Sequence, residues 1–143
     1  MSTYDIIQKA HSGWAYLALL VLAIAVINAI LGFTAKREFL SKDRKIALFA
    51  LIFTHIQLVL GLVVYFVSPM GKAALGEMKN AALRLTSLEH PLINILAIVI
   101  ITIGWSKHKK LSASTAKFKT FMIFYGIGLA LILSRIPWKM WFD

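Results

Sequence analysis

Four long runs of apolar residues, separated by short polar segments, dominate the pattern of the chain. The runs predict helices at about residues 10–33, 45–67, 88–106 and 116–136. A helix that crosses a bilayer needs about 20 mainly apolar residues, and each run is close to that length. The pattern therefore predicts one all-α domain over residues 1–143, an integral membrane four-helix bundle.

Several local signals indicate where these helices begin and end. Ser68-Pro69-Met70-Gly71 ends the second run, because Pro and Gly interrupt helices. Ser87 is the expected N-cap of the third helix, and Pro91 suits its first turn, where a missing N–H costs nothing. Residues 72–84 have the pattern of a short amphipathic helix on the membrane surface. The first residues, 1–5, lack the basic leader of a signal peptide, so we expect the first run to remain a helix.

The composition agrees with lipid as the surrounding solvent. The chain is 59% hydrophobic and 15% charged, whereas soluble domains are about 45–50% apolar and about 25% charged. It contains no cysteine, which excludes disulfides, Cys-ligated iron–sulfur clusters, covalent c-type haem attachment and thiol catalysis. The net charge is +10, and the basic residues that cause it flank the apolar runs. We therefore expect membrane lipid, and no nucleic acid, as the partner of these charges.

The basic residues also predict the orientation of the bundle. The first and third connections together carry ten lysines and arginines, and the opposite side carries six. Basic loops remain in the cytoplasm, so we expect these two connections there and both termini on the outer side. Trp138 and Trp141 then suit the outer interfacial belt, and Trp105 suits the inner one.

Two histidines open alternate helices on the same expected side of the membrane. His11 opens the first helix and His90 the third, so their imidazoles are expected at similar depth. Arg84, just before the third helix, and Arg135, at the end of the fourth, lie at the same level. Two neutral imidazoles can ligate haem iron from opposite faces, and arginine pairs with carboxylates such as the propionates. The set predicts a haem site with His11 and His90 as the metal ligands.

A stripe of small residues follows each of these histidines along its helix. The positions at helical spacing are Ala15, Ala18, Leu22, Ala25 and Ala29 after His11, Asn94, Ala97, Ile101 and Gly104 after His90, and Gly128 on the face of Arg135, and most of them are small. Small residues leave room for a macrocycle, but they also let membrane helices approach closely without any cofactor. The stripe alone does not decide between these two interpretations.

His55 lies deeper, about 16 Å from Arg44 at 1.5 Å per residue. An ionisable residue near the bilayer midplane indicates a functional site by default. Three interpretations of His55 stay open: a ligand of a deeper or second haem, a proton or quinone site, or a neutral histidine hydrogen-bonded to another helix. Tyr125, midway along the fourth helix, is its candidate partner. His108 follows the third run in a lysine-rich connection and is expected to be solvated.

Four stretches together resemble a known family. They are His11-Ser-Gly-Trp14, Thr54-His55-Ile-Gln57-Leu-Val-Leu-Gly61, Glu89-His90-Pro91 and Arg135-Ile-Pro137-Trp138. The chain resembles the small four-helix bacterial membrane proteins described as cytochrome b-like. More distantly, its layout is similar to one half of haem A synthase, where histidines at the outer ends of the first and third helices hold haem.

The resemblance implies b-type haem at His11 and His90 and a multi-pass location in a bacterial cytoplasmic (inner) membrane. In haem A synthase the first histidine belongs to a Glu-x-x-His-Arg pattern. The matching positions here read Gln8-Lys-Ala-His11-Ser12. This departure argues against haem-hydroxylating activity.

Three hypotheses of function follow. The first is a haem-binding protein that passes electrons in a respiratory or quinone-linked chain, because two histidine ligands leave no open position on the iron. The second is a cofactor-free membrane scaffold, or an accessory subunit of a larger complex. The third is a proton-coupled transporter that uses His55, although no pair of broken helices marks a midplane site. The sequence contains no motif that assigns an enzymatic reaction, and it is compatible with a homo-oligomer.

Overall fold

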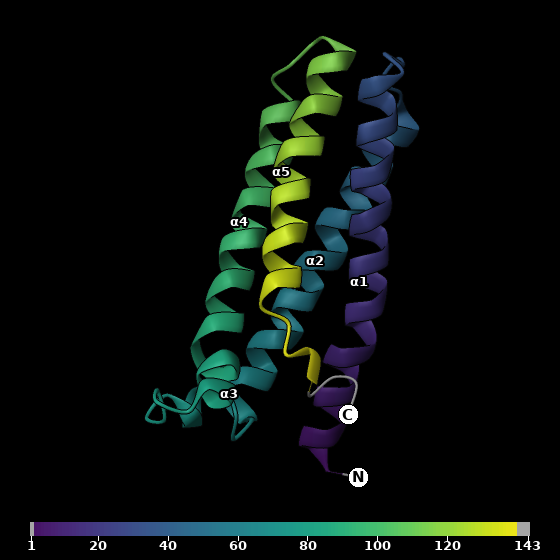
Figure 1. Cartoon of the computed structure of the whole chain (residues 1–143). Helices are drawn as coiled ribbons and strands as arrows, with labels where there is room; N and C mark the ends of the chain where they lie inside the picture. The colour runs from purple at the N-terminus through teal and green to yellow at the C-terminus, as the bar shows by residue number, and fades with distance from the viewer. Residues whose placement is uncertain (1, 140–143) are drawn as a thin grey trace.

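The computed structural model describes residues 2–139. Within that range the chain forms helices and turns but no strand, which confirms the predicted all-α fold. Four helical stretches are long and apolar enough to cross a membrane: Thr3–Thr34, Ser41–Val67, Ala81–His108 and Ser114–Ser134. They are α1, α2, the continuous stretch that ends in α4, and α5 (Figure 1). Trp141, which was expected in an interfacial belt, lies outside the described residues.

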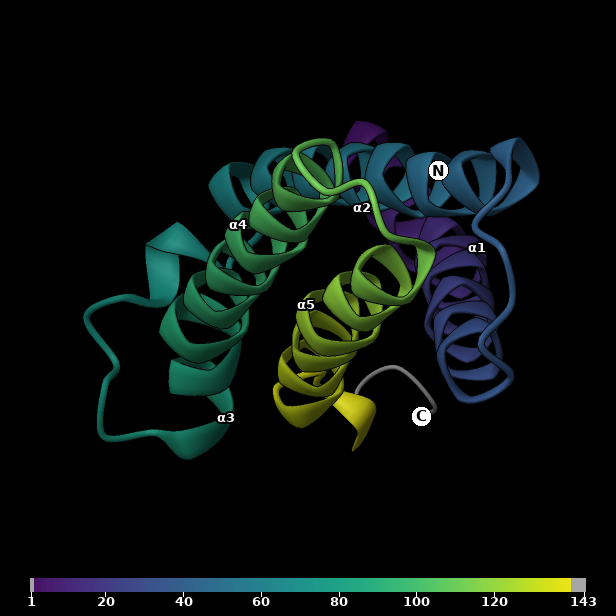
Figure 2. The same cartoon turned by 90° about the horizontal axis from the view of Figure 1, so that it is seen from above.

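The four stretches form a bundle in which α1 and α4 lie on opposite sides. α1 packs against α2 and α5, and α4 packs against the same two helices. Viewed from above, α2 and α5 therefore separate α1 from α4 (Figure 2). The start of α1 and the end of α5 lie at one end of the bundle, and the two short connections lie at the other (Figure 1). The side chains of α1 and α4 that point inward thus face each other across the bundle interior.

The first helix begins earlier than the apolar pattern predicts. It starts at Thr3 rather than near residue 10, because Ser2 and Asp5 form a reciprocal cap. The Ser2 hydroxyl accepts from the Asp5 N–H at 3.1 Å, and the Asp5 carboxylate accepts from the Ser2 N–H at 3.1 Å. The 32 residues of α1 extend for about 48 Å, against a hydrocarbon core of about 30 Å. The first turns of α1 are thus long enough to project beyond the hydrocarbon.

The third membrane-length stretch also begins earlier than predicted. α3 (Ala81–Arg84), η2 (Leu85–Glu89) and α4 (His90–His108) form one continuous helix. Asn80 caps this helix through the Leu83 N–H, so the prediction of Ser87 as N-cap was wrong. η2 is a π-type turn in which the His90 N–H bonds to Leu85 rather than to the residue four back. The wider turn lies just before Pro91, which cannot donate a backbone bond.

The segment between α2 and α3 is less regular than the expected amphipathic helix. It contains one short helix, η1 (Lys72–Ala74), followed by turns. Ser68 ties its beginning to α1, because the Tyr4 and Ser68 hydroxyls are 3.2 Å apart. A Cβ atom on Gly71 would lie 2.3 Å from the carbonyl oxygen of Tyr65. Glycine at this position therefore allows the chain to fold back against the end of α2.

In the deeper half of the bundle, side chains of neighbouring helices fill the space beside the small residues. A Cβ on Gly104 would lie 2.5 Å from Phe124, and one on Gly128 would lie 2.5 Å from Ile101. Ala25 and Ala29 are buried in the same core. This part of the small-residue stripe therefore serves close helix packing. The remaining part, nearer the histidines, borders open space.

At the end with the two short connections, a buried carboxylate holds α1 and α2 together. Asp43 is 1% exposed and accepts hydrogen bonds from Arg37 and from Asn28, each at 3.0 Å. It also accepts from the Leu40 N–H at 2.8 Å. These bonds explain the isolated polar residue Asn28 in the first apolar run, because Asn28 satisfies the buried carboxylate.

His108 belongs to this packed end and is not solvated as expected. Its side chain is buried as the last residue of α4. Its ring centre lies 4.6 Å from those of Trp105 and Phe121, and its Nδ1 bonds to the carbonyl of Trp105. The lysine-rich sequence misled the prediction, because the lysines project outward while the imidazole packs inward among aromatic rings.

Candidate functional site

A cavity of about 440 Å³ is lined by residues from the first part of α1 and the end of α5, which lie at the same end of the bundle (Figure 1). Residues of α1, α2, α4 and α5 all line it, and most of the lining is apolar. Its volume is within the range of about 300–1,000 Å³ that is typical of ligand sites. Ala15 and Ala18, the members of the small-residue stripe nearest to His11, form part of its wall. The small residues near the histidines thus border space, unlike those deeper in the bundle.

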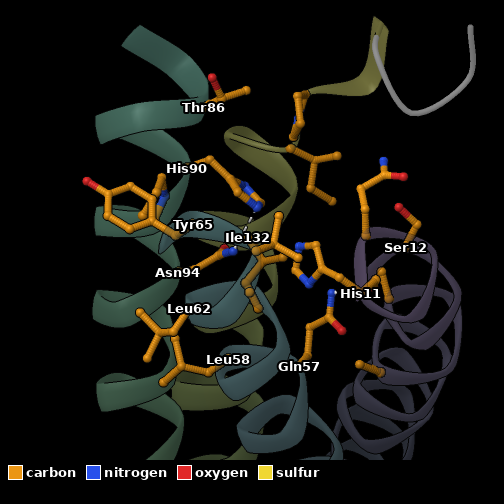
Figure 3. A pocket seen from close by; sticks show the side chains of 18 of the residues that line it. His11, Ser12, Gln57, Leu58, Leu62, Tyr65, Thr86, His90, Asn94 and Ile132 are labelled. Atoms are coloured by element: carbon orange, nitrogen blue, oxygen red, sulfur yellow. Dashed lines mark hydrogen bonds between the residues drawn. The ribbon is translucent and has the colours of Figure 1, made fainter. Parts of the chain in front are cut away.

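His11 and His90 enter this cavity from opposite sides (Figure 3). Their ring centres are 6.4 Å apart and their planes differ by 69°. His11 lies on α1, four residues before Ala15, which also lines the cavity. His90 is the first residue of α4. The structure therefore brings together the two histidines that the sequence placed at similar depth.

Two hydrogen bonds fix the His90 ring. Its Nδ1 lies 3.0 Å from the carbonyl oxygen of Arg135. A carbonyl can only accept, so Nδ1 carries the proton and donates. Nε2 then has the lone pair and accepts from the Asn94 amide at 3.2 Å (Figure 3). His90 is thereby held as a neutral imidazole with its basic nitrogen beside the cavity.

His11 has a different environment. Its Nδ1 is buried and has no hydrogen-bond partner. The ring packs directly on α2, because a Cβ on Gly61 would lie 3.1 Å from the His11 Cε1 atom. The backbone carbonyl of His11 accepts from the Gln57 amide at 2.9 Å. Contacts with α2 thus position His11, while its Nδ1 atom remains without a hydrogen-bond partner.

Unpaired polar atoms gather at this cavity. Within residues 2–139, the buried side-chain atoms without a partner are Nδ1 of His11, Oε1 of Gln57, Oγ of Ser87 and Oδ1 of Asn94. Three of the four residues that carry them, His11, Gln57 and Asn94, line the cavity. A buried polar group without a partner costs about 1–3 kcal/mol. Their concentration here is the pattern expected of a site that a ligand completes.

The two arginines predicted at this end lie beside Glu89. Arg84 Nε is 2.8 Å from Oε2 of Glu89, and Arg135 Nε is 3.7 Å from Oε1. Neither arginine is among the residues that line the cavity, although Lys9 is. Glu89 therefore contacts the arginines rather than an imidazole. Arg135 reaches His90 through its backbone carbonyl only.

His55 is not among the residues that line the cavity. Its Nδ1 lies 2.7 Å from the carbonyl of Leu51, and its Nε2 lies 3.4 Å from the Thr102 hydroxyl of α4. Tyr125, the expected partner, instead donates to the carbonyl of Ala47 at 2.9 Å. These contacts agree with the interpretation of His55 as a histidine hydrogen-bonded to another helix.

The sequence reasoning missed the roles of Asn94 and Gln57. Asn94 follows His90 by four residues, the spacing at which two helical side chains meet, and this signal was available. The hydrogen bond from Gln57 to the carbonyl of His11 joins α2 to α1. No pattern in the neighbouring sequence predicts such a bond. The Trp14 indole makes a similar bridge, donating to the carbonyl of Phe53 at 2.9 Å.

Among the residues within 2–139 that line the cavity, His11 and His90 are the only histidine, cysteine, aspartate or glutamate side chains. Among the described residues, no group of three or more His, Cys, Asp or Glu side chains is arranged to hold a metal ion. Structural zinc needs about four protein ligands, whereas haem iron takes four of its bonds from the porphyrin and needs only two axial ligands. Comparisons with protein-family models, curated proteins and solved structures found no match to this chain.

Proposed function

We propose that this protein binds b-type haem in the cavity between α1 and α4, with His11 and His90 as axial ligands, and that it transfers electrons. The observation that carries the proposal is the facing pair of imidazoles, whose ring centres are 6.4 Å apart across an apolar cavity. A metal–imidazole bond of about 2 Å, plus about 1 Å from nitrogen to ring centre, gives about 6 Å between two rings on opposite sides of one metal. The observed spacing agrees with this value.

The hydrogen bonding of His90 supports the same role. Histidines that bind metals usually donate their second ring N–H to a carbonyl or a carboxylate, which fixes the tautomer and raises the basicity of the ligating nitrogen. The bond from His90 Nδ1 to Arg135 is of this kind, and it leaves Nε2 as the ligating atom. Asn94 holds Nε2 in the absence of a ligand and would release it on binding.

The remaining residues would define the environment of the haem. The apolar wall excludes water and lowers the local dielectric, which is one of the factors that set a redox potential. Lys9 lines the cavity, and Arg84 and Arg135 lie close by on Glu89. These cations are the candidates to pair with the propionates. Bound haem supplies one-electron transfer, and two histidine ligands leave no position for oxygen.

We further propose that the protein lies in a bacterial cytoplasmic membrane with both termini and the cavity on the outer side. The support is the excess of basic residues on the two short connections, which lie at the end away from the cavity. The cavity would then meet the membrane at the headgroup level of the outer leaflet. Electrons would pass to or from a quinol or a respiratory partner.

The absorption spectrum of the purified protein, oxidised and reduced, tests the haem proposal. We expect a Soret band and sharp reduced α and β bands, which His90→Ala removes and His11→Ala strongly diminishes. His55→Gln is the matched control, because it alters a histidine that does not line the cavity. Colourless protein after expression with ample haem, or spectra unchanged by both cavity substitutions, would overturn the proposal.

A second candidate function is a cofactor-free scaffold or accessory subunit. The observation that favours it is the bond from Asn94 to Nε2 of His90, because together with the bond from Nδ1 it gives both ring nitrogens a protein partner. This function predicts colourless protein that is isolated together with a larger membrane complex. It also predicts that His90→Ala lowers stability without any spectral consequence.

A further inference from the structure

At the end of the bundle opposite the cavity, three cationic side chains converge from three different segments. Arg44 lies on α2, Lys109 follows α4, and Lys117 lies on α5. All three interact electrostatically with His108. Their meeting point is thus the junction of α2, α4 and α5.

The aromatic rings of Trp105 and Phe39 contact these three cations. The Arg44 guanidinium carbon lies 5.0 Å from the ring centre of Trp105, and Lys109 Nζ lies 5.6 Å from the same ring. Lys117 Nζ lies 5.4 Å from the ring centre of Phe39. Cation–π contacts within about 6 Å are attractive and orient the charge. Arg44 and Lys109 thus share one indole ring as their contact partner.

These charges lack a carboxylate partner. Within residues 2–139, the ion pair at this end joins Arg37 to Asp43, and the other ion pairs, both to Glu89, lie at the cavity end. Arg44 and Lys109 are exposed. Like charges held near one another repel, so an anion that settles among them lowers the energy of this arrangement.

We propose that Arg44, Lys109 and Lys117 form a binding site for the phosphate of an anionic phospholipid in the leaflet at this end. The position favours a lipid, because the three cations lie at the ends of helices that are long enough to span a membrane, where headgroups are found. Leu40, the N-cap of α2, and Phe49 on α2 are exposed apolar side chains near Arg44 in the sequence and are available to acyl chains. Basic pockets between membrane helices bind such headgroups.

Mass spectrometry of the intact protein with its bound lipid provides the test. The protein is exchanged into detergent with equal amounts of phosphatidylglycerol and phosphatidylcholine, and the retained lipid is counted. We expect preferential retention of phosphatidylglycerol. The triple substitution Arg44→Gln, Lys109→Gln and Lys117→Gln should reduce it by at least about tenfold.

Two further variants separate charge position from net charge and from folding. Lys72→Gln, Lys79→Gln and Lys139→Gln together remove the same charge elsewhere and should leave retention unchanged. The charge-keeping triple Arg44→Lys, Lys109→Arg and Lys117→Arg should still bind phosphatidylglycerol. Equal loss in both glutamine variants, equal retention of the two lipids, or displacement of the lipid by an equal amount of inorganic phosphate would each overturn the proposal.

Discussion

The Nδ1 atom of His90 donates a hydrogen bond of 3.0 Å to the carbonyl of Arg135, which lies 45 residues further along the chain. This bond joins the start of α4 to the residue that follows α5, and it determines which nitrogen of His90 is basic. His11 has no such bond, since its Nδ1 is buried without a partner. The two facing histidines would therefore be unequal as ligands of the proposed haem.

The first prediction follows from this inequality. His90→Ala should abolish haem binding, whereas His11→Ala should leave a small fraction of five-coordinate haem on His90, because His90 keeps its orienting hydrogen bond. That fraction should be high-spin and should bind carbon monoxide when reduced, as measured by difference spectra. Identical loss in the two variants, with no carbon monoxide complex in either, would contradict it.

The second prediction concerns Gly61, on which the His11 ring packs. Gly61→Ala places a Cβ 3.1 Å from His11 Cε1, so the ring must shift by a few tenths of an ångström. We expect weaker ligation by His11, seen as a larger high-spin fraction in the oxidised spectrum. Gly126→Ala is the matched control, because a Cβ there meets nothing within 4 Å. A spectral change of the same size in both variants would argue against the packing explanation.

The third prediction concerns Asn94, whose amide donates to His90 Nε2 at 3.2 Å. Nε2 of His90 would have to give up this hydrogen bond in order to ligate the iron of the proposed haem. A neutral hydrogen bond contributes about 0.5–1.5 kcal/mol, so Asn94→Ala should raise haem affinity by roughly two- to twelvefold. Titration of haem into the apoprotein measures this. Lower affinity in Asn94→Ala would mean that Asn94 stabilises the bound state instead.

The fourth prediction concerns the buried carboxylate of Asp43. Asp43→Asn leaves Arg37 without its ion-pair partner and leaves the Leu40 N–H with a weaker acceptor. Because the Arg37 side chain is 31% exposed, we expect a loss of about 1–3 kcal/mol in unfolding free energy rather than the larger cost of a fully buried pair. Thermal unfolding in detergent measures the loss. Glu38→Gln, on the exposed part of the same connection, should have little effect.

The long-range pattern of the sequence predicted more of this fold than its local signals did. Four apolar runs were sufficient to predict four membrane-length helices, because runs of that length have few alternatives in a chain of this size. Helix starts were predicted less well. Capping by Ser2 and Asp5 extends α1 through polar residues, and Asn80 rather than Ser87 begins the third stretch.

For the site, the sequence predicted which histidines meet but not what surrounds them. Equal depth on two helices that start at the same end was enough to pair His11 with His90. Asn94 could have been recognised from its spacing of four residues from His90. Gln57 and the Arg135 carbonyl reach the two histidines from other elements, and side-chain type does not reveal such contacts. His108 shows the same limit, because its burial depends on Trp105 and Phe121 packing across α4 and α5.

The diagonal placement of α1 and α4 has a mechanical consequence. Each of these two helices packs against α2 and α5, so neighbouring helices support one another along the bundle. At one end the cavity separates α1 from α4. A rigid molecule bound by both histidines would link α1 to α4 and hold them at a fixed distance there. Emptying the cavity would then loosen the His11–His90 end selectively, while the end anchored by Asp43 keeps its shape.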